Sequence, residues 1–298
     1  MDSFYSHGKL LLTSEYAVLA GAKALAIPCK KGQFLEYIPD ATALLQWKSY
    51  DEKAKLWFEA EYETSSLRLL NTSDKGVAKR LEKVLRFAKK ENSSFLITGG
   101  LVVCRLEFKR KWGLGSSSTL ISNIAQWAKV NPYRLLQVGF GGSGYDIACA
   151  LAAGPILYKR NMEEPVVKSV AFFPSFIDQL HFIYLNQKKN SQEAVQTFDL
   201  KTMNEKSIEK CNQLTDAIRI SKNIREFNVL IEEHERLIGR FIDQKPVKER
   251  LFPDFSGSIK SLGAWGGDFI LATGSKESIE YFKEKGYSTV IPYREMIL

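Results

Sequence analysis

The sequence predicts an α+β fold in two halves, on the basis of three observations. Apolar and polar residues alternate in places over 34–38, 43–48 and 55–62, which are rich in β-branched and aromatic residues and typical of strands. Strands and helices then alternate irregularly rather than in regular strand–helix units. Finally, 298 residues with 45% apolar and 26% charged content have the composition of an ordinary globular protein, which argues against a disordered or fibrous chain.

The amino-terminal half begins with short buried strands at 10–12 and 24–27, separated by a turn at 20–22. The three alternating segments follow, and together they are predicted to form a meander. The period then changes, because apolar residues recur at spacings of three and four between Val77 and Ala88, with Asp74 available as an N-cap. These features predict a helix.

The rest of this half surrounds two glycine-rich loops, at 113–119 and 139–144. Each loop is expected to precede a helix, because apolar residues at helical spacing follow it. The expected elements are a strand at 101–108, a helix at 120–130, a helix at 145–153 and a strand at 156–158.

The polar segment 161–165 predicts a boundary between a first domain, 1–165, and a second domain, 166–298. The second domain contains two long amphipathic patterns, since apolar residues recur at helical spacing over 208–218 and 227–241. Its other expected elements are strands at 180–185, 269–273 and 288–291 and a helix at 276–285.

The chain carries a formal charge of +8 and has a pI near 9.1, so it attracts anionic partners. A nucleotide, a phosphorylated metabolite or a nucleic acid would each satisfy this charge. The four cysteines are far apart and form no CxxC pair. The first residues lack the order of a signal peptide, and no apolar run approaches the roughly 18 residues of a membrane span. A cytoplasmic protein is therefore expected.

The first candidate site is the loop Gly113-Leu114-Gly115-Ser116-Ser117-Ser118-Thr119, between an expected strand and an expected helix. A helix start has unpaired N–H groups and a positive dipole potential, so it attracts phosphate. Glycines let the backbone approach an anion, and serine hydroxyls add donors and an oxygen ligand for Mg²⁺. Taken alone, the loop is equally consistent with a polar turn whose serine caps the helix. No Walker A pattern occurs in the chain.

The second candidate is Asp146, which a small-residue loop delivers to the first turn of a helix. The helix dipole favours an ionised carboxylate there, which could accept a hydroxyl proton, orient the hydroxyl or bind a metal. The alternative is an aspartate that only stabilises its own helix.

Two further segments could contribute to a site. The three glycines beside a tryptophan in Gly263–Asp268 indicate either close backbone approach to a ligand or a structural turn. Lys9 and Glu15 bracket the first apolar strand and could pair across a site, although a lone lysine in such a place is more often solvated.

Taken together in order, four segments resemble the motifs of the GHMP kinase superfamily, across essentially the whole chain. The first motif is similar to His7–Val18, the glycine-serine motif to Lys109–Thr119, and the third to Gly263–Asp268. Ser143-Gly144-Tyr145-Asp146 resembles a segment shared by mevalonate and phosphomevalonate kinases, within a compact bacterial subgroup.

The resemblance implies a two-domain fold with a ribosomal-protein-like amino-terminal domain and a ferredoxin-like carboxy-terminal domain. It implies ATP and Mg²⁺ as cofactors, ATP phosphates on Gly113 to Thr119, and Ser117 as the metal ligand. Asp146 would be the base or orienting group, and Lys9 would contact it and lower the pKa of the acceptor. The residues implied to surround the acceptor and the phosphates are Glu15, Ser143, Gly144, Gly266 and Gly267.

Several positions depart from the family pattern. His7 and Lys109 replace prolines, and Ser14 and Trp265 replace glycines. The mevalonate kinases also carry a metal-binding glutamate in the region that matches 133–137, where this chain has no carboxylate. The metal would then be held by Ser117, Asp146 and phosphates, or with help from Gln137, or in another way.

The resemblance predicts phosphoryl transfer from ATP to a small anionic or hydroxylated acceptor, mevalonate or phosphomevalonate, in isoprenoid precursor synthesis. The alternatives are a sugar kinase of the same superfamily, a basic nucleic-acid-binding protein and a catalytically silent sensor. We expect no nucleic-acid partner, because the basic clusters are not interleaved with aromatic residues as single-strand binding requires. We expect no membrane partner, because no apolar run is long enough to span a bilayer. The protein would be a monomer or a homodimer.

Overall fold

The computed structural model describes residues 1–161, 164–188, 198–265 and 267–298, which divide into two compact units. Strands β1 (Asp2–Leu11) and β2 (Ala24–Pro39) contribute residues to both units. The first unit consists of residues 1–8, 31–110 and 114–151, and the second of 9–30, 111–113 and 152–298. Met162 and Glu163 of the predicted boundary segment, and Gly266 of the third motif, lie outside the described residues.

The first unit is built on a sheet in the order β5-β4-β3-β6-β2, with β1 paired to β2. The strands not yet defined are β3 (Leu44–Tyr50), β4 (Leu56–Glu63), β5 (Leu69–Thr72) and β6 (Gly100–Leu106). The predicted meander is confirmed between β3 and β4, which pair antiparallel. It was wrong between β2 and β3, because β6 lies between them, antiparallel to β2 and parallel to β3. A mostly buried strand such as β6 suits this central place, and the local alternation that reveals a strand does not reveal its partner.

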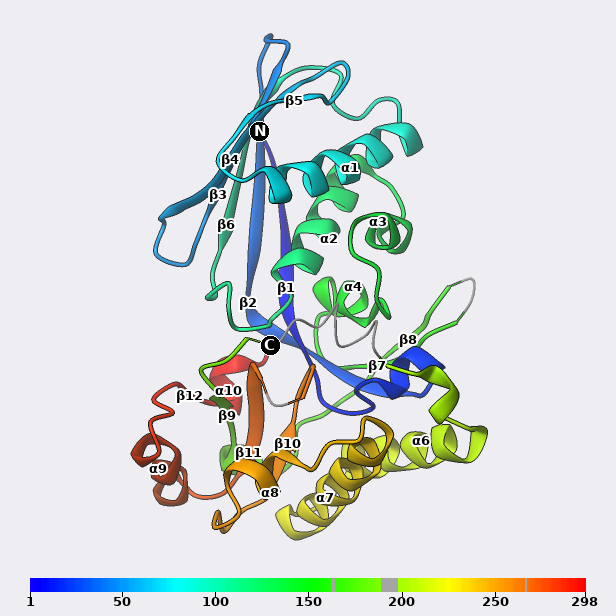
Figure 1. The fold of residues 1–298 in the computed structure, drawn as a ribbon, viewed down its shortest axis with the longest axis vertical. Coiled ribbons are helices and arrows are strands. Elements are labelled where there is room, and N and C mark those ends of the chain that lie inside the picture. The colour runs from blue at the N-terminus through cyan, green and yellow to red at the C-terminus, as the bar shows by residue number, and fades with distance from the viewer. Residues whose placement is uncertain (162–163, 189–197, 266) are drawn as a thin grey trace. The chain divides into compact units, whose positions relative to one another are not determined.

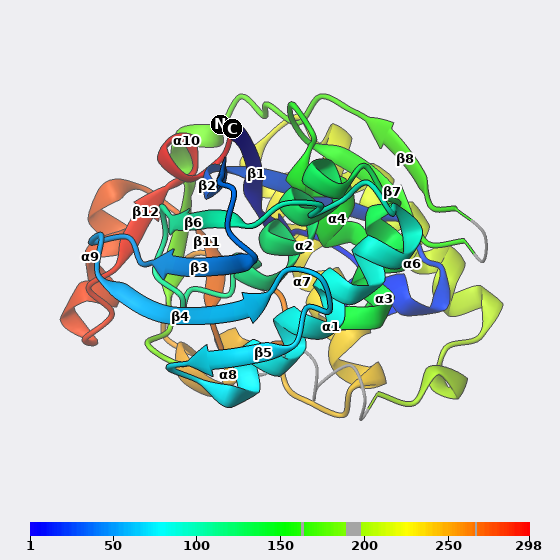
Figure 2. The same cartoon turned by 90° about the horizontal axis from the view of Figure 1, so that it is seen from above.

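Helices α1, α2, α3 and α4 belong to the same unit, and the first two cover one face of this sheet (Figures 1 and 2). Their bounds are α1 (Lys75–Glu91), α2 (Ser116–Ala128), α3 (Pro132–Gly139) and α4 (Tyr145–Ala150). The predicted Asp74 cap is confirmed, since its carboxylate accepts the backbone N–H groups of Gly76 and Val77. The core between sheet and helices includes Leu35, Trp47, Leu85, Val102, Ile121 and Leu135.

Helix α2 begins at Ser116, four residues before the expected start at Leu120. The serines of the first glycine-rich loop therefore form the first helical turn. Their hydroxyls give no apolar periodicity, so the pattern that marks the rest of the helix is missing there. Helix α3 was not predicted, although Asn131 followed by proline at the first helical position is a start signal.

The second unit contains an antiparallel sheet in the order β10-β11-β9-β12. Its strands are β9 (Leu180–Tyr184), β10 (Ile259–Ser261), β11 (Phe269–Thr273) and β12 (Val290–Pro292). Its helices are α6 (Glu205–Ile220), α7 (Ile224–Phe241), α8 (Val247–Leu251), α9 (Lys276–Glu284) and α10 (Tyr293–Met296). The chain runs strand, helices, strand, strand, helix, strand, which is the ferredoxin-like order that was expected.

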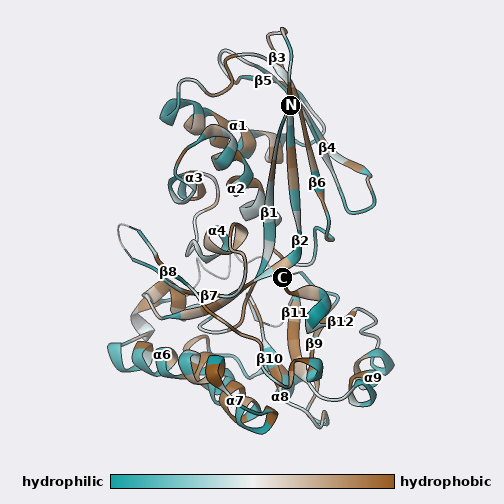
Figure 3. Cartoon of the chain, turned by 180° about the vertical axis from the view of Figure 1, so that it is seen from behind, coloured by the Kyte–Doolittle hydropathy of each residue, from teal (hydrophilic) through white to brown (hydrophobic). Residues whose placement is uncertain are grey.

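Both faces of this second sheet are buried, which explains why β11 reads as a continuous apolar run. One face packs Ile183 and Ile270 against Phe282 of α9. On the other, Phe182 stacks on Tyr293 with ring centroids 5.7 Å apart. Figure 3 shows β11 in hydrophobic colours, whereas α9 carries both hydrophilic and hydrophobic ones.

Two further strands belong to the second unit, β7 (Ile156–Lys159) and β8 (Val166–Ser169). Strand β7 was predicted, and it pairs with the first residues of β2 and with β8. Among the described residues, no helix combines the length and the apolar content needed to cross a bilayer.

Candidate functional site

Helix α2 begins differently from the other described helices of eight or more residues. Those helices start at Asp74, Asn131, Asn204, Asn223 and Ser275, whose side chains accept backbone N–H groups of the first turn. Helix α2 starts at Gly115, which has no side chain to cap it, and no acidic residue lies in its first turn. The first N–H groups of α2 therefore have no side-chain cap, which suits an anion.

The backbone before α2 requires glycine at two positions. Gly113 and Gly115 have φ angles of +67° and +88°, a region that glycine enters without strain. A Cβ atom on Gly113 would also lie 2.3 Å from Oδ2 of Asp268. Within the second unit, the last residue of the third motif is thus packed against the first residue of the glycine-serine loop. Leu114 between the two glycines is fully buried and anchors the loop.

The side chains of the first turn of α2 divide into two kinds. Ser117 is exposed, whereas Ser118 and Thr119 are 9% and 1% exposed. The Thr119 hydroxyl donates to Oε1 of Gln33 at 2.6 Å and so ties the helix to β2. Ser117 is therefore the exposed residue among 116–119, and its contact with ATP or Mg²⁺ stays a prediction.

Asp146 lies in the first turn of α4, a helix that packs against α2 within the first unit. It is half-buried, and Gly144 before the helix has a φ of +90°. Ser143 is half-buried and precedes this glycine in the same turn. The structure thus brings the helix that carries Asp146 and the helix that carries Ser117 together in one unit.

Lys9 is a half-buried residue near the end of β1 and belongs to the second unit. Its positive charge acts on Cys29, where burial raises the pKa of the thiol to about 12 and Lys9 opposes the shift. The predicted contact between Lys9 and Asp146 joins residues of different units and stays a prediction.

Glu15 is buried rather than open to a ligand, with 1% of its surface exposed. Its Oε1 lies 2.5 Å from Nζ of Lys260, which is also 2.9 Å from Oε1 of Glu235. Sequence reasoning missed both partners. Glu235 lies four residues after Ile231 and three before Ile238, on the buried face of the predicted helix. This position could have identified Glu235 as a buried charge from the sequence.

The described part of the third motif is anchored by Trp265, which is fully buried against Ala17, Cys211 and Leu237. Trp265 is thus a core residue, which matches the interpretation of this segment as a structural turn. Gly267 is buried, and the backbone N–H of Asp268 donates to the carbonyl of Gln187 at 2.7 Å.

Two of the departures from the family pattern keep a backbone conformation that suits glycine. Ser14 has a φ of +61° and Trp265 a φ of +54°. Both replace glycines in the motifs that the sequence resembles. The backbone at each position therefore keeps the left-handed conformation that suits glycine, and the added side chain makes contacts of its own. The Ser14 hydroxyl donates to the carbonyl of Lys23 at 2.6 Å.

The predicted Mg²⁺ site can be compared with the side chains near α2. Among the described residues, no group of three or more His, Cys, Asp or Glu side chains is arranged to hold a metal. Mg²⁺ commonly needs only one or two carboxylates when substrate phosphates complete its shell. The hydroxyl of Ser117 and the carboxylate of Asp146 are of the kind that Mg²⁺ binds, and their contact with the ion stays a prediction. The Gln137 amide donates to the carbonyl of Gly142 at 3.4 Å.

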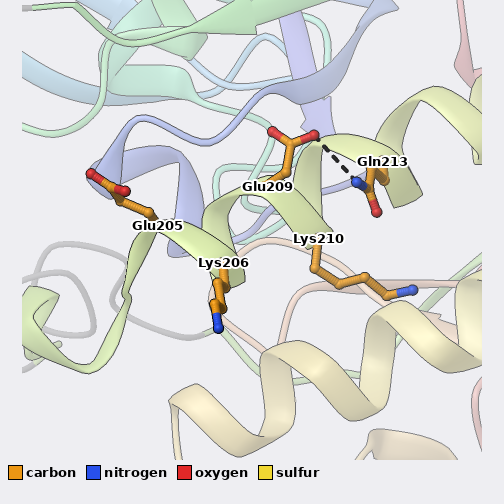
Figure 4. A pocket seen from close by; sticks show the side chains of 5 residues that line it. All are labelled: Glu205, Lys206, Glu209, Lys210 and Gln213. Carbon is orange, nitrogen blue, oxygen red and sulfur yellow. Dashed lines mark hydrogen bonds between the residues drawn. The ribbon is translucent and has the colours of Figure 1, made fainter.

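A shallow hollow on the surface of α6 contains none of the predicted site residues. Figure 4 shows its lining side chains extending from a single helix: Glu205, Lys206, Glu209, Lys210 and Gln213. Gln213 donates to Oε1 of Glu209 at 3.3 Å, and Lys210 pairs with Glu233 at 2.6 Å. These are contacts of a solvated charged helix surface.

No protein-family model matches the sequence, and no curated protein matches it. Solved structures do match. Mevalonate kinase from Methanococcus jannaschii aligns with 97% of this chain and 96% of its own, at 16% identity and a TM-score of 0.70. Phosphomevalonate kinase from Streptococcus pneumoniae, solved with phosphomevalonate and AMPPNP, aligns over 96% of both chains at 15% identity and a TM-score of 0.69.

Galactokinase from Lactococcus lactis, solved with galactose, aligns with 98% of this chain and 93% of its own, at 13% identity and a TM-score of 0.61. These matches extend over nearly the whole chain at identities that show the fold alone. The predicted α+β class is confirmed, and the chain has the fold shared by mevalonate kinase, phosphomevalonate kinase and galactokinase.

Proposed function

We propose that the protein is an ATP-dependent kinase that phosphorylates mevalonate or phosphomevalonate. The observation that carries the proposal is the start of α2, where Gly115 replaces the side-chain cap found on the other described helices of comparable length. Its fold, shared with a phosphomevalonate kinase solved with AMPPNP, supports a nucleotide as the anion that takes this place.

In this proposal the first N–H groups of α2 bind the phosphates of ATP. Phosphoryl transfer depends mostly on positioning and on neutralising charge, so backbone donors and cations supply much of the catalysis. Ser117 is the residue that would hold Mg²⁺ together with the phosphates, whose charge the bound ion would neutralise. Lys9 would stabilise the ionised acceptor oxygen.

The role of Asp146 separates the two acceptors. A phosphate monoester has a second pKa near 6 and is largely ionised at neutral pH, so its oxygen needs little help from a base. An alcohol keeps its proton until transfer, and a positioned base then contributes roughly 10²- to 10⁴-fold. Loss of Asp146 should therefore slow a mevalonate kinase far more than a phosphomevalonate kinase.

The test is ATP consumption with product identification by mass spectrometry, using mevalonate, phosphomevalonate, galactose and a heptose phosphate as acceptors. We expect turnover with mevalonate or phosphomevalonate. The Asp146→Ala variant should reduce kcat by about 10²-fold or more on an alcohol and by less than about 10-fold on a phosphate. Ser117→Ala should weaken use of Mg²⁺–ATP with either acceptor.

Two outcomes would contradict the proposal in different ways. Turnover with galactose or the heptose phosphate, without turnover of mevalonate or its phosphate, would assign a sugar kinase. Galactokinase shares the fold, so this result would keep the nucleotide site and change the acceptor. No turnover with any acceptor, together with salt-sensitive RNA binding, would exclude the kinase.

A further inference from the structure

A buried ionic cluster in the second unit centres on Lys260 of β10. The cluster consists of Lys260 and the side chains around it, Glu15, His234, Glu235 and Ser261, of which the three charged ones are at most 2% exposed. Lys260 Nζ donates to Oε1 of Glu15, to Oε1 of Glu235 and to the carbonyl of Ser261, at 2.5, 2.9 and 2.6 Å. All three ammonium hydrogens of Lys260 are thus used.

The cluster holds the loop that follows β1. Ser14 and Tyr16, on either side of Glu15, both have positive φ angles, +61° and +62°, which are costly for residues with a side chain. His234 Nε2 accepts the backbone N–H of Ser14 at 2.8 Å, and Lys260 holds the carboxylate of Glu15. The strained turn is therefore fixed from two neighbouring elements, α7 and β10.

The same cluster reaches the start of the third motif. The Tyr16 hydroxyl donates to the carbonyl of Ala264 at 3.2 Å. Lys260 Nζ lies 5.9 Å from the centre of the Trp265 ring, within range of a cation–π contact. Lys260 also precedes this segment by only a few residues, so the loop at 12–16 and the segment 263–265 share one set of supports.

Stability alone is a weak reason for such an arrangement. Burying three charges has a large desolvation cost, and apolar side chains of similar size often give an equal or greater stability. Strained backbone that surrounding contacts enforce is concentrated at functional sites. The two segments that Lys260 holds are also parts of the first and third motifs.

We propose that Lys260 is a positioning residue for the phosphoryl transfer proposed above. It fixes the loop at 12–16, which continues from the strand carrying Lys9, and the segment 263–265, which leads to Asp268 beside Gly113. Its loss would let both segments leave their positions together, and the placement of Lys9 and of Gly113 would become less well defined. This inference depends on the proposed function for its kinetic consequence only.

The single variant Lys260→Met leaves two buried carboxylates unpaired and could fail to fold for that reason alone. The informative variant therefore removes all the charges: Glu15→Gln, Glu235→Gln and Lys260→Met together. We expect this triple variant to fold with a melting temperature close to that of the wild type. Its kcat/KM should nevertheless fall at least 10-fold, because kcat is lowered and KM for ATP is raised. The variant Lys260→Arg, which keeps the positive charge, should retain more activity than the triple variant.

The matched control is Lys210→Met, which removes an exposed ion pair in the same unit, at 2.6 Å from Glu233. This control should leave kcat and KM unchanged. A folded triple variant with wild-type kcat and KM would overturn the positioning role and leave the cluster purely structural.

Hydrogen exchange separates this inference from the proposed function. In the triple variant, amides at 12–16 and at 263–265 should exchange at least 10-fold faster, while those of α1 keep their wild-type rates. If no acceptor is phosphorylated but both segments loosen together, the proposed function fails and the linkage by Lys260 stands. If exchange at either segment is unchanged, the linkage is wrong whatever the activity.

Discussion

At the scale of single residues, Glu15 is a carboxyl group whose ionisation is disfavoured by its burial in the Lys260 cluster. Two carboxylates face one ammonium, and His234 is neutral because its Nε2 accepts a hydrogen bond. Burial raises the pKa of Glu15 to about 7, with Lys260 opposing the shift and Glu235 adding to it. Burial and the charge of Lys260 hold the pKa of His234 well below its usual range. The pKa of Lys260 is raised, since its two carboxylate partners outweigh its own burial.

This arrangement predicts a pH dependence of stability. Because the pKa of Glu15 is higher in the folded chain than its usual 4.5, the protonated carboxyl favours folding. That contribution is complete below pH 4.5 and is lost as the pH rises to about 7, by at most about 1.4 kcal/mol per pH unit. The measurement is the free energy of unfolding in urea from pH 4.5 to 8, for the wild type and for Glu15→Gln.

The free energy of unfolding of the wild type should fall relative to that of Glu15→Gln as the pH rises to about 7. Above that pH, the difference between the two free energies should stay constant. His234 and the surface groups are common to both proteins, so the difference reports Glu15. Parallel curves from pH 4.5 to 8 would show that Glu15 keeps its ordinary pKa in the folded chain.

At the scale of elements, the nucleotide site proposed at the start of α2 can be tested with one substitution. Gly115→Asp would place a carboxylate where the phosphates are expected, and aspartate tolerates the left-handed conformation better than most residues. The new side chain would cap the first turn and repel the anion. We expect the affinity for Mg²⁺–AMPPNP to fall at least 10-fold, measured by calorimetry, with helix content unchanged by circular dichroism.

The matched control is Asn131→Asp at the start of α3, which changes one good cap for another. It adds the same charge to the same unit and should leave the affinity for nucleotide within about 2-fold. An equal loss of affinity in both variants would mean that net charge, and not the start of α2, determines binding.

The elements also show what local pattern can and cannot predict. Helices α1, α6 and α7 were predicted because each buries a stripe at helical spacing. Strand β10 was missed because Lys260 occupies a fully buried position in it, which breaks the apolar pattern. The position of β6 between β2 and β3 was missed because strand pairing is set by contacts far apart in the sequence.

At the scale of the whole molecule, the two units are assembled from segments that are not contiguous. Residues 9–30 and 111–113 belong with the carboxy-terminal part of the chain, whereas residues 1–8, 31–110 and 114–151 form the first unit. The predicted boundary at residue 165 follows composition along the chain, which does not show exchanges of this kind. The same limit applies to the site, since Lys260 and Glu15 are 245 residues apart and no spacing rule connects them.

Nucleotide binding should stabilise the molecule, because a ligand that binds only the folded chain shifts the unfolding equilibrium. At 100 times its dissociation constant, Mg²⁺–AMPPNP would contribute about 2.7 kcal/mol, which corresponds to a rise of about 4 to 6 °C in melting temperature. Scanning calorimetry gives this shift and shows whether the two units unfold in one transition or in two. Mg²⁺ alone should give less than about 1 °C, since no cluster of three ligands is present among the described residues. The Gly115→Asp variant should lose most of the shift, because its carboxylate would repel the phosphates and accept an N–H group of the first turn. A full shift in that variant would place the nucleotide away from α2 and would remove the main support for the proposed function.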